Sequence, residues 1–318
     1  MHTVARMHAV AFTDFGPPDV LRPVDLPVPH VDPVADPTAV RVAVRAAGVM
    51  PFDTGVRAGE FPRSLTPGLP EHPVVPGNEF AGVVDEAGPD SGFAAGDEVF
   101  GFTTLGAYAE YVVVPSANLA RKPAAMPWTV AAALPGNGQG AHMALRELNV
   151  GPGDTVLIHA AAGGLGTLAV QIARAWGAAT VIGTAGEANH DYLRELGATP
   201  VRYGPGLIER VRAAAPDGVD AVLDGAGREA LLASVEVVRD RDRIVTMIDD
   251  AAARELGLRE WTPSRDARRL VDLADLWSRG ELRVHFRAVL PLADAADAHR
   301  LVERGHGRGK VVLTVDAS

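Results

Sequence analysis

The stretch Ala160-Ala161-Ala162-Gly163-Gly164-Leu165-Gly166 points most directly to the fold of this chain. It follows a short apolar run at residues 155–159 and opens an amphipathic segment at residues 165–176. This order predicts a strand, a glycine-rich turn and a helix, and the glycines of such a turn let the backbone approach a pyrophosphate. The helix N-terminus adds unpaired N–H groups and the positive end of the helix dipole. We therefore predict that the glycine turn (residues 160–166) binds a dinucleotide. The alternative is a glycine-rich turn without a ligand.

After the glycine turn, short apolar runs typical of strands continue to alternate with amphipathic segments typical of helices. Such alternation predicts right-handed crossovers and a parallel, doubly wound sheet, whose ligands bind beyond the carboxyl ends of the strands. Strands are predicted at residues 180–184, 201–203, 219–223 and 243–248, and helices at residues 188–196, 207–215 and 229–238.

The chain before residue 128 has a different character. Pro and Gly are dense there, and the apolar runs are short, at residues 39–46, 98–102 and 109–114. This pattern predicts a β-rich domain with many turns. A chain of 318 residues is also at the size where one hydrophobic core divides into two, so we expect two domains.

Composition excludes several classes of function. The hydrophobic fraction of 47% and the charged fraction of 22% are ordinary for a soluble globular protein. The net charge of −10 argues against nucleic acid or an anionic membrane as partner, so we expect a small-molecule partner. No apolar run is long enough for a membrane span or a signal peptide, which predicts a cytoplasmic protein. The chain has no Cys, which excludes disulfides, thiol nucleophiles and thiolate metal ligands.

The end of the second predicted strand of this sheet bears on the choice between NAD and NADP. NAD sites usually place an Asp or Glu about 20 residues after the glycines, where the carboxylate binds the ribose 2′-hydroxyl. Here that place reads Gly183-Thr184-Ala185-Gly186, without a carboxylate, and Glu187 follows one step later. A carboxylate would repel the 2′-phosphate of NADP, so its absence favours NADP. His190, Arg194 and Arg202 are candidate partners of that phosphate, and they also fit the pattern of solvated surface charges.

Further motifs between Met7 and Val315 carry a family resemblance. They are Ala47-Gly48-Val49, Phe52-Asp53, Val56-Arg57-Ala58-Gly59, residues 76–84, residues 96–101, residues 106–111, the glycine turn, Asp224-Gly225-Ala226-Gly227 and residues 309–313. The chain resembles the medium-chain dehydrogenase/reductases of the zinc-independent quinone-oxidoreductase type, which includes zeta-crystallin. The resemblance implies an α/β fold with a GroES-like β-rich catalytic domain, residues 1–127 and 258–318, and a Rossmann domain, residues 128–257. It also implies a homodimer that pairs the edge strands of its Rossmann sheets near residues 243–248.

Metal binding is not expected. Zinc-dependent relatives use a Cys and then a His in a Gly-His-Glu triplet, and this chain has Met50 and the triplet Gly77-Asn78-Glu79 at these places. A catalytic zinc needs three protein ligands, and this set is missing. We interpret Glu79 as a structural carboxylate bonded to nearby backbone, with a catalytic role as the alternative.

The zinc-free members that the chain resembles reduce quinones or α,β-unsaturated carbonyl compounds (enones) with NADPH. Hydride addition to a conjugated acceptor leaves an enolate that needs only a hydrogen-bond donor or a polar pocket. We therefore expect an NADPH-dependent quinone or enone oxidoreductase. The alternative is a dinucleotide-binding protein of the same fold that has been repurposed for a non-redox role.

The resemblance also places the cofactor and substrate contacts. Tyr203 matches a position that contacts the adenosine phosphate in relatives. For Lys310, the alternative is a solvated charge at a strand end. The expected substrate-cleft residues are Met50, Phe52, Gly55 and Asn137. The expected cofactor contacts are Ala162, Gly163, Gly164, Leu165, Gly166, Gly183, Thr184, Tyr203, Gly225, Met247 and Lys310.

No strong general acid or nucleophile is evident, and the catalytic candidates are Asp53, Tyr108 and His142. Each has a structural alternative: a turn cap for the Asp, a core position for the Tyr, and a helix-face position without a ligand for the His. Met50, Gly55 and Gly140 depart from the family pattern toward smaller or less polar residues. This predicts a roomier, more apolar pocket that suits a bulky biosynthetic intermediate.

Overall fold

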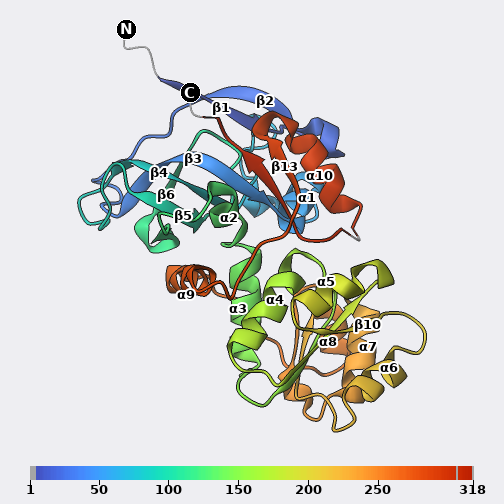
Figure 1. The fold of residues 1–318 in the computed structure, drawn as a ribbon. Helices are drawn as coiled ribbons and strands as arrows, with labels where there is room; N and C mark the ends of the chain where they lie inside the picture. The colour runs from blue at the N-terminus through green and yellow to red at the C-terminus, as the bar shows by residue number, and fades with distance from the viewer. Residues whose placement is uncertain (1–4, 306, 317–318) are drawn as a thin grey trace. The chain divides into compact units, whose positions relative to one another are not determined.

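The computed structural model describes residues 5–305 and 307–316. Contacts divide the chain into two compact units, which appear in Figure 1 as the parts built around different sheets. Unit 1 consists of Met1–Gly136, Asp266–Ala274 and Phe286–Ser318. Unit 2 consists of Asn137–Arg265 and Asp275–His285. The α9 helix (Ala267–Ser278) carries residues of both units.

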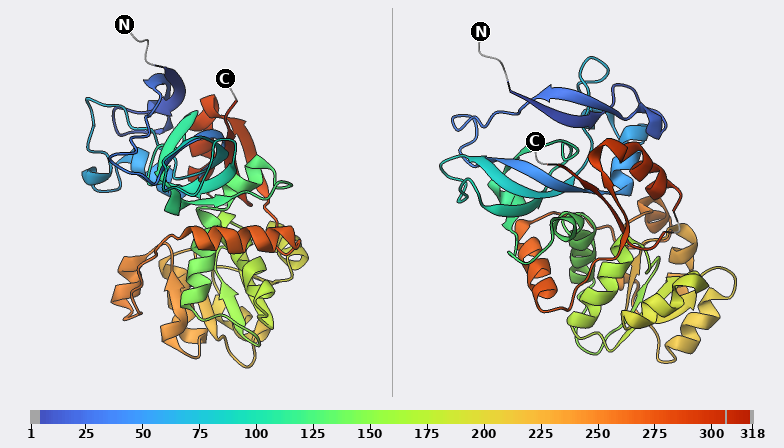
Figure 2. Two further views of the ribbon diagram at one scale, coloured as in Figure 1. Left: turned by 90° about the vertical axis from the view of Figure 1, so that its left-hand side faces the viewer. Right: turned by 45° about the horizontal axis from the view of Figure 1, so that its top comes forward.

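Unit 1 is built on a mixed sheet with the order β13-β14-β3-β4-β5-β7, and β6 also pairs with β3. The strands β1 and β2 form a separate two-stranded ribbon, drawn in dark blue in Figure 2. The strands are β1 (Arg6–Ala11), β2 (Arg22–Pro27), β3 (Ala39–Val49), β4 (Glu79–Ala87), β5 (Glu98–Phe102), β6 (Tyr111–Pro115), β7 (Leu119–Arg121), β13 (Phe286–Pro291) and β14 (Lys310–Thr314). The helices are α1 (Pro51–Ala58), α2 (Trp128–Ala133) and α10 (Ala295–Glu303).

The core of unit 1 follows from the alternation of apolar residues in β3. Val40, Val42 and Val44 point to the same face of the sheet and are buried. They pack in one cluster with side chains of β4 and β14 and with small residues of α10, among them Ala295 and Ala298. The predicted β-rich domain is therefore present, with a helix from the C-terminal part of the chain packed into its core.

Unit 2 contains a parallel sheet of five strands with the order β10-β9-β8-β11-β12. The order reverses between β8 and β11, which is the switch point where doubly wound sheets bind ligands. The strands are β8 (Thr155–Ile158), β9 (Thr180–Ala185), β10 (Thr199–Arg202), β11 (Ala221–Asp224) and β12 (Ile244–Thr246). The helices are α3 (Asn137–Glu147), α4 (Gly164–Ala175), α5 (His190–Glu195), α6 (Leu207–Ala214), α7 (Arg228–Val237) and α8 (Asp250–Glu255).

Strands of unit 2 are apolar on both faces because helices cover both sides of a doubly wound sheet. In β8, the side chains of Val156, Leu157 and Ile158 are all fully buried. The helices α6, α7 and α8 share one hydrophobic cluster with the sheet, and α3 packs against α4. The predicted α/β fold with a parallel, doubly wound sheet is confirmed.

Three predicted strands of this sheet are displaced or shortened. The strand predicted at residues 201–203 begins two residues earlier, at Thr199. The strand predicted at residues 219–223 begins only at Ala221, because Val219 forms an isolated bridge with Val238. The strand predicted at residues 243–248 ends at Thr246. There the Thr246 hydroxyl accepts the N–H groups of Ile248 and Asp249, at 3.1 Å each, and the chain turns.

The unit boundaries differ from the predicted domain boundaries at residues 127/128 and 257/258. The α2 helix packs against β3, β4 and β14, so unit 1 continues to Gly136. Residues 258–265 and 275–285 belong to unit 2. Their attachments include a hydrogen bond from the Trp261 indole to the Thr246 carbonyl and one from the Arg283 N–H to the Gln171 side chain. Among the described residues, every helix is too short or too polar to cross a membrane.

Candidate functional site

The glycine turn joins the end of β8 to the start of α4, as predicted. Gly163 is the residue before the first helical turn, and its N–H donates to the Ala160 carbonyl at 3.0 Å. Ala160 has a φ of 53°, a left-handed conformation that costs a non-glycine residue about 1–2 kcal/mol. Strain of this kind is concentrated at functional sites. The turn therefore has the strand–turn–helix context that a phosphate-binding loop requires.

Gly166 allows α4 to pack closely on the turn. A Cβ atom at this position would lie 2.6 Å from the Ala161 Cα and still closer to the Ala160 carbonyl oxygen. Both obstacles are backbone atoms, so no side-chain rotation can relieve the clash. Only glycine fits here, and the N-terminus of α4 is thereby held against the end of β8.

A buried histidine supports the same turn from behind. His159 lies between the hydroxyls of Thr184, 3.2 Å from Nδ1, and Ser234, 3.1 Å from Nε2. The Ser234 hydroxyl gives its proton to the Ala230 carbonyl, so Nε2 is the donor to it, and the Thr184 hydroxyl donates to Nδ1. Thr184 in turn accepts the N–H of Ala160 at 3.2 Å. Thr184 was predicted to contact the cofactor. In the structure, its hydroxyl instead bonds His159 and the backbone of the glycine turn.

The protonation of His159 predicts a pH dependence of stability. Burial lowers its pKa from 6.5 to about 4, so the unfolded chain binds a proton more readily than the folded chain between these values. The contribution of neutral His159 to the free energy of unfolding is complete above pH 6.5 and falls as the pH falls toward 4. We expect the free energy of unfolding to lose about 2 kcal/mol from this residue between pH 6.5 and 5. Urea unfolding of the wild type and of His159→Gln at pH 7.5 and 5.0 measures this loss of unfolding free energy. Equal losses in both proteins would contradict this assignment.

Hydrogen bonds join the carboxyl ends of the neighbouring strands β11 and β12. The Asp224 carboxylate accepts the N–H groups of Ala226 and Gly227 and the hydroxyl of Thr246, at 2.7 to 3.2 Å. Burial raises the pKa of Asp224, and these hydrogen bonds oppose that rise. The carboxylate thus ties the end of β11 to the end of β12. Sequence analysis quoted Asp224 in a motif but assigned it no role, because a single Asp carries no recognisable spacing.

The other cofactor residues predicted in unit 2 lie along this edge. Gly225 lies beside the His159 carbonyl, and Gly183 beside the Ala161 side chain. Leu165 and Met247 approach the position that a Cβ of Gly140 would occupy, at 3.2 and 3.4 Å. The glycine turn and the ends of four strands therefore bring these predicted residues to one side of the sheet.

Tyr203 lies at the next strand end. Its side chain is 52% exposed, and its hydroxyl would lie 3.8 Å from a Cβ at Gly186. The ring is therefore accessible and close to the end of β9, where the family resemblance implies contact with the adenosine part of the cofactor. That contact stays a prediction.

In unit 1, strand register brings Glu79 and Lys310 together. Val311 of β14 pairs with Val49 of β3, and Phe80 of β4 pairs with Ala47, so the two charged residues meet at one end of β3. Their side chains form a buried ion pair, with 0% and 4% of their surfaces exposed. Lys310, for which a solvated strand-end position was the alternative, is thus a buried cation.

The same carboxylate is enclosed by backbone. Glu79 Oε2 accepts the N–H of Gly136 at 2.5 Å, and a Cβ at Gly48 would lie 2.5 Å from the carboxyl carbon. The Met50 sulfur lies beside the same glycine. This arrangement agrees with the interpretation of Glu79 as a structural carboxylate bonded to nearby backbone.

The space left by two glycines is filled in the structure. A Cβ at Gly55 would lie 2.8 Å from the Phe61 ring, which also packs against Phe52 with ring centroids 4.9 Å apart. Gly140 is covered by Leu165 and Met247, as described above. Phe61 therefore occupies the space beside Gly55, while the roomier pocket predicted from these two glycines stays a prediction. The apolar character at Phe52 and Phe61 remains.

Asp53 and Tyr108 belong to a buried polar group. Asp53 accepts the N–H of Met50 at 2.9 Å, which caps α1, and lies 3.4 Å from the Tyr108 hydroxyl. The hydroxyl is 3.3 Å from Nε2 of His299, a residue that sequence analysis missed. Burial raises the pKa of Tyr108 well above 10, and burial with the nearby Arg57 lowers that of His299 to about 3. The side chains of Asp53 and Tyr108 are fully buried, so their proposed catalytic role stays a prediction.

The remaining candidates lie on α3. His142 is buried, and its ring meets the Trp176 ring edge to face at 5.0 Å. Its role as a proton donor stays a prediction. Asn137 is the first residue of the helix and is also buried.

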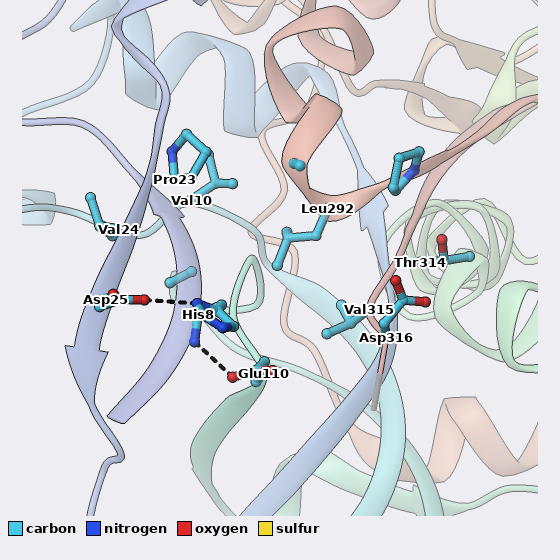
Figure 3. Close-up of a pocket in the computed structure, with 13 residues that line it drawn as sticks. His8, Val10, Pro23, Val24, Asp25, Glu110, Leu292, Thr314, Val315 and Asp316 are labelled. Atoms are coloured by element: carbon cyan, nitrogen blue, oxygen red, sulfur yellow. Dashed lines mark hydrogen bonds and ion pairs between the residues drawn. The ribbon is translucent and has the colours of Figure 1, made fainter. Parts of the chain in front are cut away.

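A hollow of about 430 Å³ lies elsewhere in unit 1 (Figure 3). It is bounded by the β1–β2 ribbon and by the C-terminal end of β14, at Thr314. His8 bonds Asp25 through its ring at 2.7 Å and Glu110 through its backbone N–H at 2.7 Å. Because Lys310 stands at the opposite end of β14, the hollow is distinct from the predicted substrate and cofactor residues of this unit.

Comparison with known proteins gives the family. A family model described as "Alcohol dehydrogenase GroES-like domain" matches residues 36–124, and one described as "Zinc-binding dehydrogenase" matches residues 196–313. The chain is 32% identical to the rat synaptic vesicle membrane protein VAT-1 homolog over 90% of this chain and 79% of that protein. The chain belongs to the medium-chain dehydrogenase/reductase superfamily. The predicted resemblance is therefore confirmed. A polyketide synthase component of Streptomyces venezuelae, PikAII, is 34% identical over 88% of this chain, which spans 8% of that protein.

Solved structures of the superfamily extend the comparison. The quinone oxidoreductase of Coxiella burnetii has a TM-score of 0.86 at 32% identity, covering 98% of this chain and 100% of that one. A mycobacterial protein complexed with NADPH has a TM-score of 0.84 at 31% identity, covering 97% and 100%. A protein described as an NAD-dependent alcohol dehydrogenase has a TM-score of 0.84 at 33% identity, covering 98% and 100%.

The residues of this member do not fit a catalytic zinc site, despite the description of the second family model. The places of the Cys and His ligands hold Met50 and Asn78, and the neighbouring Glu79 is neutralised by Lys310. Within residues 5–305 and 307–316, His, Asp and Glu side chains form no group of three that could hold a metal ion. By contrast, the glycine turn and its supports fit a dinucleotide, because only glycine at 166 leaves room for the close helix start.

Proposed function

We propose that this protein reduces a quinone or an α,β-unsaturated carbonyl compound by hydride transfer from NADPH. The observation that carries the proposal is the glycine turn, which presents the N-terminus of α4 at the switch point of the parallel sheet. Unpaired N–H groups and the helix dipole at that point stabilise a pyrophosphate. Membership of a family that includes quinone oxidoreductases supports the reaction class.

The chain's own residues support chemistry without a metal. Bound nicotinamide would supply the hydride, and the protein's task is to orient it against the acceptor and to exclude water. Met50 and Phe52, the proposed substrate contacts, are apolar and suit a conjugated ring or chain. The relatives named as polyketide synthase components fit an enone of polyketide type.

The preference for NADPH rests on the end of β9. Gly183 and Gly186 stand where an NAD site usually has its carboxylate, and one solved relative is complexed with NADPH. Another relative is described as NAD-dependent, so the preference is part of the proposal. Lys310 remains a proposed cofactor contact, since its buried ammonium keeps N–H donors beyond the one that meets Glu79.

The test is oxidation of NADPH by the purified protein with 1,4-benzoquinone, 9,10-phenanthrenequinone and 4-phenyl-3-buten-2-one. Cyclohexanone, which lacks conjugation, is the matched control acceptor. We expect kcat/KM with NADPH to exceed that with NADH by at least about tenfold, which corresponds to one charge-assisted contact. Oxidation with cyclohexanone at equal rates would contradict the proposed acceptor class.

A specific outcome would favour the non-redox alternative. If NADPH quenches the tryptophan fluorescence at micromolar concentration but is not consumed with any acceptor, the protein binds the dinucleotide without redox turnover.

Homodimerisation at the edge strand β12 also remains a proposal.

A further inference from the structure

We propose that the ion pair between Glu187 and Arg202 sets the cofactor preference of this protein. Arg202 would bind the 2′-phosphate of NADP, and Glu187 would limit that preference by occupying the same guanidinium and by favouring the ribose 2′-hydroxyl of NAD. The inference rests on the proposed function, because it requires that the edge of the parallel sheet binds a dinucleotide.

Strand register places the pair at the end of β9. Arg202 is the last residue of β10 and pairs with Ala185, the last residue of β9. Glu187 begins the short 3₁₀ helix η4 (Glu187–Asn189), two residues after the strand ends. Arg202 Nη1 and Glu187 Oε1 are 3.1 Å apart. The β10 strand packs against α5, which follows η4, and both elements are labelled in Figure 1. In sheets of this type, the end of the second strand is where the adenosine ribose lies.

Exposure makes the pair open to exchange with a ligand. The side chains of Arg202 and Glu187 are 64% and 71% exposed, and such pairs contribute less than about 1 kcal/mol. A guanidinium has five N–H donors, and one of them is directed to this carboxylate. A phosphate dianion can therefore bind the remaining donors or displace the carboxylate. If Arg202 turned away, the free carboxylate would repel the phosphate and accept the 2′-hydroxyl.

Other basic side chains in this part of the unit have different hydrogen-bond or ion-pair partners. Arg194 pairs with Asp191 at 2.6 Å within α5. His190 has its Nε2 3.3 Å from the Ala185 carbonyl. Arg210 donates to the backbone carbonyls of residues 202, 203 and 204, so it holds the loop that carries Arg202. Arg202 is therefore the cation that the strand end itself presents beside a carboxylate.

Isothermal titration of NADP⁺ and NAD⁺ separates the two roles of the pair. For Glu187→Gln, we expect NADP⁺ to bind about three- to tenfold more tightly and NAD⁺ to bind no more tightly. For Arg202→Gln, we expect NADP⁺ binding to weaken at least about tenfold while NAD⁺ binding changes less than about twofold. Added salt should reduce the NADP⁺ preference of the wild type, because the contact is exposed.

The exposed pair of Asp191 and Arg194 provides matched controls. Asp191→Asn and Arg194→Gln change the same charges on the same unit, and we expect the NADP⁺ to NAD⁺ ratio to stay within about twofold of wild type. If Arg202→Gln weakens both dinucleotides equally, or if Glu187→Gln leaves the ratio unchanged, the inference is overturned. A wild type that binds both dinucleotides but oxidises neither NADPH nor NADH would refute the proposed reaction alone. A wild type that binds neither would refute both.

Discussion

Gly166→Val is expected to weaken NADP⁺ binding by at least about 100-fold, which corresponds to the loss of one or two hydrogen bonds to the charged pyrophosphate. The valine Cβ would lie 2.6 Å from the Ala161 Cα, so either the glycine turn or the start of α4 must move. Either movement takes the N–H groups of the helix away from the pyrophosphate. Isothermal titration with NADP⁺ measures the change.

Controls distinguish this local effect from loss of folding. Gly151→Ala adds a methyl group where no atom lies within 4 Å, on the same unit, and should bind NADP⁺ like the wild type. Gly163→Ala, whose Cβ would lie 3.3 Å from the Ala160 carbonyl oxygen, should show an intermediate loss. Circular dichroism and thermal melting check that each variant folds. A folded Gly166→Val protein with unchanged affinity would show that the turn does not bind the cofactor.

Lys310→Met is expected to lower the free energy of unfolding by about 3–5 kcal/mol, because it leaves the carboxylate of Glu79 buried without its cation. Glu79 is fully buried, and its other hydrogen bond, from the Gly136 N–H, does not neutralise the charge. Urea unfolding followed by fluorescence and circular dichroism measures the loss.

The paired variant Glu79→Gln/Lys310→Met removes both charges. We expect it to recover most of the lost stability and to lie within about 2 kcal/mol of wild type, since a buried pair often adds little over uncharged residues. Arg121→Gln is the control in the same unit: it breaks a pair with Asp97 in which the arginine is 59% exposed, and should cost less than about 1 kcal/mol. If Lys310→Met matched this control, the pair would not be buried in solution.

Local pattern explains why so much of unit 2 was predictable. The apolar run before the glycine turn and the 3.6-residue period after it lie within a single stretch, so β8 and α4 follow from neighbouring residues. Strand ends are less local: β12 stops at Thr246 because a side-chain hydroxyl takes the N–H groups of the next turn, which apolar periodicity does not encode.

The surroundings of the site residues were harder to predict from the sequence than the elements that carry them. Lys310 and Glu79 belong to distant motifs, and only the register of β14 on β3 and of β3 on β4 brings them together. Gly55 was interpreted as space, but Phe61 fills it. His159 stands directly before the glycine turn, yet its partners Thr184 and Ser234 come from other elements of the sheet and its helices.

The residues of this chain, taken in order, were enough for its class of fold, its family and the strand–turn–helix order around its glycine turn, because each of these depends on residue type and short spacing. Folding was needed to show which polar groups are buried and which partners they have. Burial and pairing arise where strands distant in sequence adopt a common register. That register is set by the packing of whole faces rather than by any single motif.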